Sequence, residues 1–484
     1  MQRVVDAWLM KKMYELKPES NFDYSDRGTG QLFATIFKDL CRYNVTAREW
    51  YTYSRGRWKQ DTGGMLTSRY AKLLSDAMTI YCTHIKDERI RKTFSDLCTR
   101  LGQRRYRTTM IEDARDFFFF SSNDLDKDLF LFNCLNGVLN LITFEFMEHS
   151  PDYLMSKQAN VFYDPKASGK EWKKFVNEVL ENNQDKIKYL QKLLGYSLTG
   201  GTKEESCYLL YGSTTRNGKS TLVETFAHML GNTDGYALNM RPETLAQKAN
   251  TDSRQASGDI ARLAGCRFLN ASEPPKRMVF DVALLKTLLG RDSITARHLH
   301  QSEFQFIPVF KLFMNTNYLP VINDPTLFSS GRLNVITFDR HFEPEEQDKG
   351  LKDRLKEKNN LSGLLNWCID GLKAYYAEGA IPPLDVVNAT KQYEEDSDKI
   401  GSFIGECLIE SDKNSKAKDV YDRYSEWCKD NGFGTENKTN FFAELKHKGI
   451  FSMTGTVNGK TCKNVVKNYE IDEWKDVNDS TPFD

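Results

Sequence analysis

One segment near the middle of the chain constrains the fold more than any other, and it reads SCYLLYGSTTRNGKSTLVETFAHMLG at residues 206–231. A short apolar run is followed by a turn of small polar residues and then by an amphipathic helix, with Leu222, Phe226 and Met229 on one face. The first backbone N–H groups of such a helix point at one spot, where the helix dipole adds about half a positive charge. Strand, turn and helix in this order predict a phosphate-binding loop.

The residues of this loop have predicted roles. Lys219 is expected to reach the β- and γ-phosphates of ATP, and the Ser220 hydroxyl is expected to hold Mg²⁺. The usual pattern has about four residues between its first glycine and Gly-Lys, whereas five follow Gly212 here. Either the loop is one residue longer or Ser213 replaces the first glycine, and the alternative interpretation is an ordinary glycine turn that caps a core helix. The predicted nucleotide-binding residues are Gly212, Asn217, Gly218, Lys219, Ser220 and Thr221.

Composition narrows the class of protein. At 484 residues the chain is long enough for about three domains. Its 67 Lys and Arg residues balance 67 Asp and Glu residues, so any contact with DNA has to come from local patches. None of the ten cysteines belongs to a Cys-x-x-Cys pair, which favours reduced thiols without a zinc site. No run of about eighteen apolar residues occurs, and we expect a cytoplasmic protein without a membrane partner.

Hydrophobic patterning predicts five regions. The first is mostly helical with a hairpin around Arg55-Gly56, and the second contains short strands followed by helices. The third alternates strand-like and helical runs, which predicts an α/β fold with a largely parallel sheet covered by helices. A charged helical extension and a final small unit follow. The five regions are 1–105, 106–200, 201–345, 346–397 and 398–484.

Two short segments depart from the overall charge balance. Residues 86–107 carry a net charge of +5, for which a solvated helix face is the alternative to a nucleic-acid surface. Residues 438–467 also carry +5, and they belong to an order of helix, helix and a hairpin that turns at Asn458-Gly459. That order predicts a winged helix, which would bind DNA or alternatively another protein. Its candidate DNA-binding residues are Lys438, Lys446, Lys448, Lys460 and Lys463.

Hydrolysis of ATP needs more than a phosphate loop, and three downstream residues are nominated for it. Glu273 ends an apolar strand and is expected to polarise the attacking water. Asn317 ends the strand FKLFMNT and is expected to sense the γ-phosphate. Arg332 precedes another strand and is a candidate arginine finger for the nucleotide of a neighbouring subunit. Each residue taken alone is more often a turn or cap residue, and their order after the loop favours the functional interpretation.

The runs GDIARLAGCRFLNASEPPK, LLKTLLGRDSITARHLHQSEFQFIPVFKLFMNTNYLP and GRLNVITFDRHF resemble the superfamily-3 helicase domain of the phage and plasmid primase-helicase family, relatives of the poxvirus primase-helicase. The resemblance implies an AAA+-type ring, usually a hexamer, that binds ATP between subunits and moves 3′ to 5′ on single-stranded DNA. It places Lys219 and Ser220 in Walker A, Glu273 in Walker B, Asn317 at sensor 1 and Arg332 at the finger. Residues 106–200 resemble the family's lead-in or collar region, and residues 398–470 resemble its winged helix.

The resemblance also implies a β-hairpin that projects into the ring pore, between Lys286 and Phe306. Arg297, His298 and His300 are its expected DNA contacts. A ring of such residues would grip phosphates without reading sequence. The alternative is a surface hairpin in which Arg297 pairs with Asp292.

Two departures from the family pattern matter. The carboxylates Asp124, Asp126 and Asp128 lack a partner His motif and are interpreted as a solvated turn, so a helicase without the primase is expected. Gly331 stands where relatives often have an arginine, which leaves Arg332 as the main finger candidate and Arg340 as a reserve.

The sequence thus favours an ATP- and Mg²⁺-dependent replicative DNA helicase of a phage, plasmid or other mobile element. Single- and double-stranded DNA, further copies of the chain in a homo-hexamer, and a separate primase or polymerase are the expected partners, in the cytoplasm of a bacterial host. The alternative is an origin-binding initiator whose ATP site controls assembly without processive unwinding. A small-molecule kinase is a third choice, which the absence of a lid or acceptor-binding motif disfavours.

Overall fold

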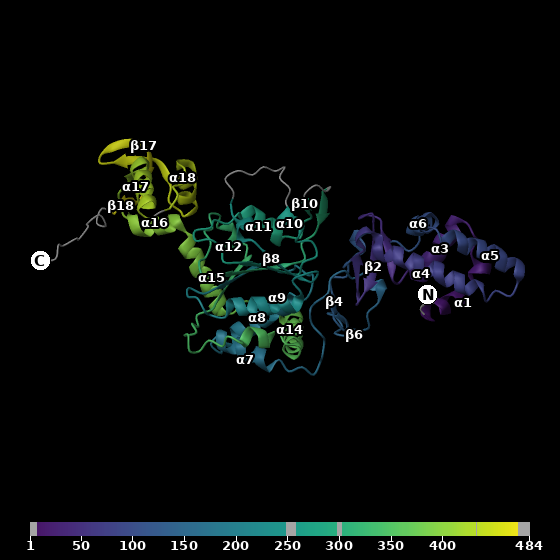
Figure 1. Cartoon of the computed structure of the whole chain (residues 1–484). Helices are drawn as coiled ribbons and strands as arrows, with labels where there is room; N and C mark the ends of the chain where they lie inside the picture. The colour runs from purple at the N-terminus through teal and green to yellow at the C-terminus, as the bar shows by residue number, and fades with distance from the viewer. Residues whose placement is uncertain (1–6, 248–257, 298–302, 432, 473–484) are drawn as a thin grey trace.

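The computed structural model describes residues 7–247, 258–297, 303–431 and 433–472 of the chain. A central α/β body lies between an N-terminal unit and a C-terminal unit, and the two units project from different sides of it (Figure 1). No helix among the described residues is both long enough and apolar enough to cross a membrane.

The N-terminal unit is mostly helical, as expected, and contains one small antiparallel sheet in the order β1-β2-β3. The predicted hairpin is β2 with β3, which turns at Arg55-Gly56 with positive φ at both residues. Phe33, Leu74 and Phe94 are buried in the core of this unit. Its elements are α1 (Ala7–Leu16), α2 (Pro18–Asn21), α3 (Asp26–Phe37), β1 (Cys41–Asn44), β2 (Glu49–Ser54), β3 (Arg57–Gln60), α4 (Met65–Cys82), α5 (Glu88–Leu101) and α6 (Arg104–Asp113).

The expected boundary at residue 105 falls inside α6. This helix buries Met110 in the same core as Phe33, so the N-terminal unit continues beyond the boundary. The chain then forms a second three-stranded antiparallel sheet, β4-β5-β6, and two helices. These elements are β4 (Leu131–Cys134), β5 (Gly137–Asn140), β6 (Phe146–Met147), α7 (Lys170–Val179) and α8 (Gln184–Tyr196).

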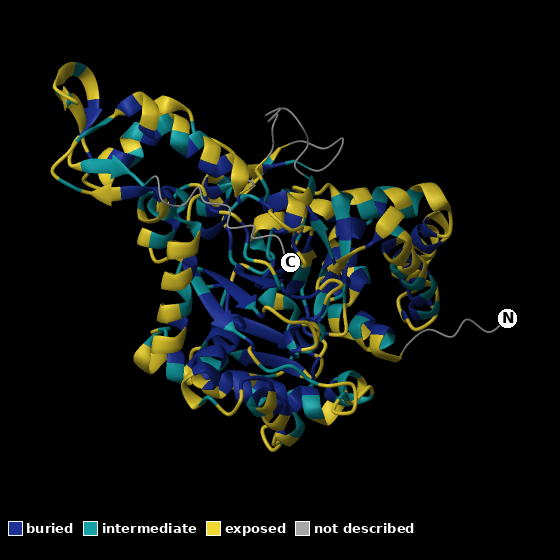
Figure 2. Cartoon of the chain, turned by 90° about the vertical axis from the view of Figure 1, so that its left-hand side faces the viewer, coloured by how far each residue is buried: buried dark blue, intermediate teal, exposed yellow. Residues whose placement is uncertain are grey.

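A five-stranded, all-parallel sheet in the order β13-β7-β12-β9-β8 forms the centre of the molecule and confirms the predicted α/β class. Its strands are buried, as the dark blue arrows of Figure 2 indicate. Alternate side chains of β7 enter opposite cores, because successive residues of a strand point to opposite faces: Tyr208 enters one and Leu209 the other. The strands are β7 (Cys207–Tyr211), β8 (Ala237–Met240), β9 (Phe268–Ser272), β12 (Lys311–Thr316) and β13 (Leu333–Thr337).

Helices cover both faces of this sheet (Figure 1). One face packs on α7, α8, α9 (Lys219–Leu230) and α14 (Lys358–Glu378). The other carries α11 (Val282–Leu289) and α12 (Thr326–Ser329), with α10 (Gly258–Ala261) nearby. A short hairpin of β10 (Ile294–Ala296) and β11 (Phe304–Phe306) stands beside α10, and α13 (Leu351–Leu355) leads into α14.

One core joins three of the predicted regions. Helix α8 packs along α14 so closely that a Cβ atom on Gly371 would lie 2.1 Å from the carbonyl oxygen of Gln191. Behind α8, the buried side chains of Arg267 and Lys311 donate to the carbonyl groups of Leu198 and Thr199. The boundaries expected at residues 200 and 345 therefore do not coincide with breaks in this core, because the sheet face stays buried only when α8 and α14 cover it.

The C-terminal unit follows α15 (Leu384–Ser397), which packs against β13. Its core holds Phe403, Tyr424 and Phe441. The two predicted helices and the hairpin at Asn458-Gly459 are all present, and both turn residues have positive φ. The elements are α16 (Lys399–Cys407), β14 (Leu408–Glu410), β15 (Ser415–Lys416), α17 (Ala417–Asp430), α18 (Lys438–His447), β16 (Ser452–Val457), β17 (Lys460–Val466) and β18 (Tyr469–Ile471).

Candidate functional site

The predicted phosphate loop connects β7 to α9, so the strand, turn and helix lie where the sequence places them. Gly218 has a φ of 82°, and a Cβ atom there would lie 2.3 Å from Val179 Cγ1 of α7. At Gly212 a Cβ atom would lie 2.2 Å from Asn217 Nδ2 and 2.7 Å from the carbonyl oxygen of Phe338. A side chain therefore does not fit at Gly212, which favours the interpretation that the loop is one residue longer than the usual pattern.

Lys219 is the first residue of α9, and its side chain is buried at 3% exposure. Its Nζ donates to the carbonyl oxygen of Gly212 at 3.3 Å. Burial lowers the pKa of this ammonium group to about 8, because removal from water disfavours the charged form. Among the described residues no carboxylate pairs with it. A desolvated cation without a counter-ion at a helix N-terminus is suited to an anionic ligand.

Two cavities meet at Ser220, one on each side of the loop. The first, of about 810 Å³, is lined by Ser220, Glu273 and Asn315, with Arg241 and Arg262 on its far side. The second, of about 600 Å³, lies between the loop and the segment after β13. Its lining includes Phe175, Arg216, Asn217, Gly218, Lys219, Thr221, Phe342, Lys352 and Arg354. Five of the six predicted nucleotide-binding residues thus line the second cavity, and the sixth, Gly212, accepts a hydrogen bond from Lys219.

The carboxyl ends of three neighbouring strands bring the other candidates to the loop. Register pairs Tyr211 of β7 with Thr316 of β12, so the residues that follow them share one edge of the sheet. Glu273 follows β9, is exposed and lines the same cavity as Ser220. Asn317 follows β12, and its Nδ2 donates to the carbonyl oxygen of Thr214 in the loop at 2.7 Å. Both predicted residues therefore lie at the loop.

Sequence reasoning missed Asn315. This residue is buried within β12, and its Nδ2 donates to Ser220 Oγ at 3.1 Å. Asn317, two residues further on and just after the strand, also directs its side chain to the loop. The repeated asparagine in FMNTN was the signal that could have found it.

Arg332 lies at the opposite edge of the sheet. It precedes β13, whose first residue Leu333 pairs with Cys207 at the start of β7. A strand of five residues is about 16 Å long, so Arg332 cannot reach the loop of its own chain. Its Nη2 pairs with Glu205 Oε2 at 2.6 Å, and Arg291 pairs with the other oxygen of that carboxylate at 3.2 Å.

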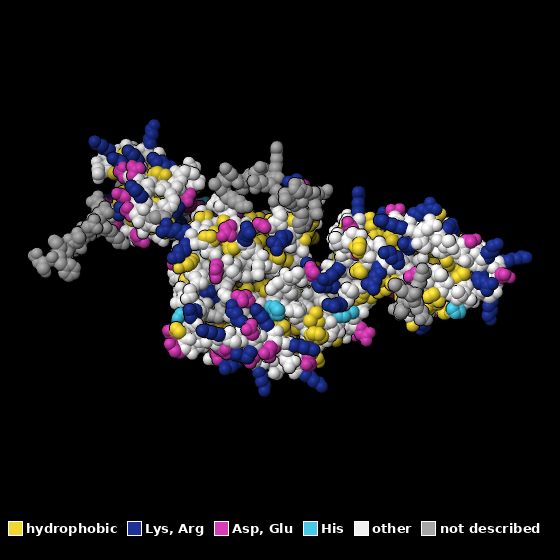
Figure 3. All heavy atoms as spheres, in the orientation of Figure 1, with side chains coloured by type: hydrophobic (Ala, Val, Ile, Leu, Met, Phe, Trp, Pro, Cys, Tyr) yellow, Lys and Arg dark blue, Asp and Glu magenta, His cyan; other side chains and the backbone are white. Residues whose placement is uncertain are grey.

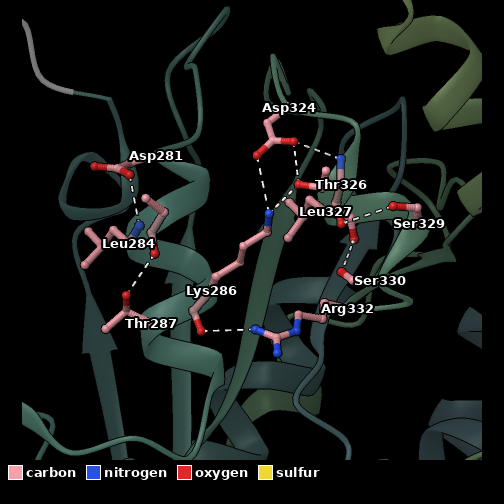
Figure 4. A network of polar contacts seen from close by, with 11 residues as sticks. Asp281, Leu284, Lys286, Thr287, Asp324, Thr326, Leu327, Ser329, Ser330 and Arg332 are labelled. Carbon is pink, nitrogen blue, oxygen red and sulfur yellow. Dashed lines mark hydrogen bonds and ion pairs between the residues drawn. The ribbon is translucent and has the colours of Figure 1, made fainter. Parts of the chain in front are cut away.

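A polar network continues from Arg332 into α11 (Figure 4). Arg332 Nη1 donates to the carbonyl oxygen of Lys286 at 3.2 Å. The Lys286 side chain extends the other way and pairs with Asp324 at 3.3 Å. Lys286 therefore has a structural role in this network. The reserve candidate Arg340 follows β13 on the loop side, where it pairs with Glu346.

Two short strands pair where the pore hairpin is expected, whereas its place in a pore and the role of Arg297 as a DNA contact stay predictions. Ile294 pairs with Phe306 in an antiparallel register, and Arg297 follows the first strand. His298 and His300 lie outside the described residues, so their role as DNA contacts stays a prediction.

The five predicted DNA-binding lysines of the C-terminal unit are all exposed. Lys438 and Lys446 belong to α18, whereas Lys460 and Lys463 belong to β17 of the hairpin. Lys448 differs from the others, because it pairs with Asp398, the residue that caps α16. Its charge is therefore partly neutralised within the chain.

The acidic cluster before β4 serves local structure. Asp124 accepts from the backbone N–H of Ser121 at 2.8 Å, and Asp126 accepts from that of Ser156 at 2.9 Å. Within the described residues, no group of three or more His, Cys, Asp or Glu side chains is arranged to hold a metal ion.

Two segments of the chain match known protein families. Residues 30–181 match the D5 N terminal like family, and residues 395–476 match the Poxvirus D5 protein-like family. A "Putative helicase" of Acanthamoeba polyphaga mimivirus is 28% identical over 422 residues, which cover 80% of this chain and 43% of that protein. These matches support a D5-like primase-helicase family.

Further relatives agree with this assignment. A "Putative helicase" of Frog virus 3 is 26% identical over 252 residues, 48% of this chain and 25% of its own length. A "Putative primase" of African swine fever virus is 23% identical over 331 residues, 63% of this chain and 34% of its own length. The chain thus spans less than half the length of these relatives. They come from viruses of eukaryotes, so they lend no support to the expected phage or plasmid source or to a bacterial host.

Among solved structures, the apo structure of the NrS-1 C terminal region aligns with 88% of this chain and 95% of its own length, at 11% identity and a TM-score of 0.48. The sequence relatives support a replication function of the helicase type.

Proposed function

We propose that the chain is the motor of an ATP-dependent replicative DNA helicase. In this proposal Gly212, Asn217, Gly218, Lys219, Ser220 and Thr221 bind the phosphates of ATP with Mg²⁺. The observation that carries it is the buried, unneutralised Lys219 ammonium group at the start of α9, between two cavities. An anion there would restore a partner to a cation that folding has desolvated.

The residues fit this ligand on both sides of the loop. The exposed Ser220 hydroxyl faces the cavity of Glu273 and Asn315, where oxygen ligands suitable for Mg²⁺ gather. Bound Mg²⁺ would neutralise charge that develops on the phosphates. Glu273 would orient the attacking water, and Asn317 would exchange its bond to Thr214 for one to the γ-phosphate or the water.

Arg332 would act on the nucleotide of a neighbouring subunit. Its place at the amino-terminal edge of the sheet, about a full strand length from its own loop, supports a finger supplied in trans. Such an arrangement requires a neighbouring copy at each nucleotide site, and we propose that the copies form a homo-hexameric ring. Arg340 is the reserve candidate for a contact within the same subunit.

The ring would translocate 3′ to 5′ on single-stranded DNA and unwind duplex. Arg297, His298 and His300 would grip the strand in the pore, and Lys438, Lys446, Lys448, Lys460 and Lys463 of a winged helix would hold duplex DNA. A separate primase or polymerase would use the exposed template. The names of the viral relatives support this function.

Displacement of a labelled strand from forked DNA tests the proposal. With ATP and Mg²⁺, the wild-type chain should unwind forks with a 3′ tail and leave forks with only a 5′ tail intact. Lys219→Ala protein should neither hydrolyse ATP nor unwind. Active hydrolysis without unwinding from either tail would favour the initiator, and normal hydrolysis by Lys219→Ala would contradict the site itself.

A further inference from the structure

A basic cavity lies in the N-terminal unit, apart from the residues of the nucleotide site, and Arg104 and Arg107 of the basic segment 86–107 belong to its lining. It is bounded by β1, β2, the start of α4 and α6, and its volume is about 820 Å³. Lys and Arg side chains are frequent on the visible face of this unit (Figure 3). The cationic residues that line the cavity are Arg48, Arg69, Lys72, Arg104, Arg107 and Arg115, against the two acids Glu49 and Glu112.

The lining has more cationic than acidic residues, six against two. Among the described residues, none of the six cations forms an ion pair. Arg107 donates to the carbonyl oxygens of Leu101 and Gly102 at 2.7 and 2.6 Å, which holds it in place without cancelling its charge. A hollow whose walls carry an excess of cations has a positive potential and attracts anions.

Aromatic side chains form another part of the wall. Tyr43 of β1 and Trp50 of β2 are paired across the strands, with ring centroids 5.6 Å apart. Arg115 lies over the Tyr43 ring at 5.0 Å. The indole N–H of Trp50 is buried without an acceptor among the described residues, although such a donor normally finds a partner. The lining of the cavity therefore combines cations with aromatic side chains.

The rim of the cavity is open. Gly63 and Gly64 have φ values of 70° and 63°, and a Cβ atom on either would meet nothing within 4 Å. The neighbouring Met65 is 72% exposed, which leaves apolar surface at the entrance. A chain could therefore enter along this side.

We propose that this cavity binds a single strand of nucleic acid. The cations would contact its phosphates, and a base would lie against Tyr43, the combination by which proteins hold single strands without reading sequence. The volume lies in the range of pockets for drug-sized ligands, about 300–1,000 Å³, which suits a nucleotide unit of a strand. A duplex presents phosphates, sugars and base edges but keeps the flat faces of its bases stacked inside, so it would leave the aromatic wall without a stacking partner. An acidic protein segment would likewise leave that wall without a planar partner.

Binding of a short fluorescent oligo(dT) to the full chain, measured by anisotropy without ATP, tests the proposal. Arg69→Gln with Lys72→Gln removes two exposed cations from one turn of α4 at the cavity. Arg89→Gln with Lys92→Gln makes the same charge change on α5, outside the cavity but within the basic segment 86–107. The cavity variant should bind several-fold more weakly, and its salt slope should fall by about 1.4, or 0.7 for each lost phosphate contact. The affinity of the control variant for oligo(dT) should stay within about twofold of the wild-type affinity.

Equal weakening by both variants would indicate a diffuse basic face and overturn the proposal, as would no weakening by the cavity variant. Displacement of the oligonucleotide by dTMP at the same concentration of nucleotide units would overturn it as well, because the cavity would then hold a free mononucleotide.

A crosslink locates the strand directly. Oligo(dT) that carries 5-iododeoxyuridine should attach to the tryptic peptides 43–48 and 49–55, which contain Tyr43 and Trp50. Crosslinks confined to the β10–β11 hairpin or the C-terminal unit would overturn the proposal. These measurements contain no ATP, so their outcome is independent of the proposed motor. A chain that does not hydrolyse ATP can still crosslink at residues 43–55, and a chain that does hydrolyse ATP can fail to crosslink there.

Discussion

Arg332 Nη2 lies 2.6 Å from Glu205 Oε2, at the edge of the central sheet that faces away from the Lys219 loop. The pair joins residues 127 positions apart and is shared with Arg291, which binds the same carboxylate. In a ring, Arg332 would have to exchange this internal partner for the nucleotide of a neighbour. In the proposed ring, Glu205 would therefore compete with the neighbouring nucleotide for Arg332.

We expect Arg332→Ala to leave ATP binding unchanged and to lower turnover severely, since arginine fingers contribute about 10³ to 10⁵ in rate. Arg291→Ala is the matched control, because it removes the other arginine on Glu205 and should keep turnover near that of wild type. Steady-state ATPase assays measure the turnover of both variants, and nucleotide titrations measure their affinity for ATP. A mixture of Arg332→Ala and Lys219→Ala chains should regain activity, because some interfaces then combine an intact loop with an intact finger. If the mixture stays inactive, the finger does not act in trans.

The affinity for ATP should depend on pH through Lys219. Burial holds the pKa of the free site at about 8, and a bound polyanion raises it. The ammonium group is charged below this value, so affinity should be highest there and should fall as the pH rises through 8. Titrations of a fluorescent ATP analogue between about pH 7 and 9.5 measure this pH dependence of the affinity. Lys219→Arg should lose this dependence, since guanidinium stays charged. If the affinity of this variant for ATP falls with pH in the same way, the pH dependence belongs to another group.

Substitutions of Asn315 in β12 and of Asn317 just after it should have different effects on ATP hydrolysis. Asn315→Ala removes the bond to Ser220, worth about 0.5–1.5 kcal/mol, and should raise the Mg²⁺ concentration needed for half-maximal activity a few-fold. Asn317→Ala should instead lower kcat with little change in that Mg²⁺ requirement. ATPase assays at varied Mg²⁺ distinguish them. Reversed effects would make Asn315 the γ-phosphate sensor.

Replacement of Arg297, His298 and His300 together by alanine should keep basal hydrolysis and abolish its stimulation by single-stranded DNA, because the pore would lose its grip on phosphates. Lys391→Ala, on the exposed side of α15, is a control that should keep stimulation. Hydrolysis rates with and without oligo(dT) measure the effect. Persistent stimulation in the triple variant would exclude the hairpin as the contact.

Gly371→Ala should destabilise the central body, since the added Cβ atom would lie 2.1 Å from the Gln191 carbonyl oxygen and force α14 away from α8. A cost of about 1–3 kcal/mol is typical for overpacking. The same change at Gly405 of α16 meets nothing within 4 Å and should be neutral or stabilising by up to about 1 kcal/mol. Thermal unfolding followed by circular dichroism compares the two. An unchanged transition in Gly371→Ala would contradict the close packing of these helices.

Local patterns in the sequence predicted the elements that local forces determine. Apolar spacing placed β7 and α9, and glycine or asparagine turns placed the hairpins at Arg55-Gly56 and Asn458-Gly459. Each of these depends on residues close together in the chain, through helical or alternating periodicity and positive φ. The order of motifs also placed Glu273 and Asn317 beside the loop, because parallel strands end at a common edge.

The sequence by itself thus determined the α/β class, the loop and the identity of most candidate residues. Only the tertiary structure decided that α8 and α14 share one core, that Asn315 contacts Ser220, that Arg332 lies away from its own loop, and that Tyr43 and Trp50 meet six cations around a cavity. The physical reason is that strand order and helix docking join residues far apart in sequence. The periodicity of a segment indicates which of its faces is buried but does not indicate which distant segment packs against that face.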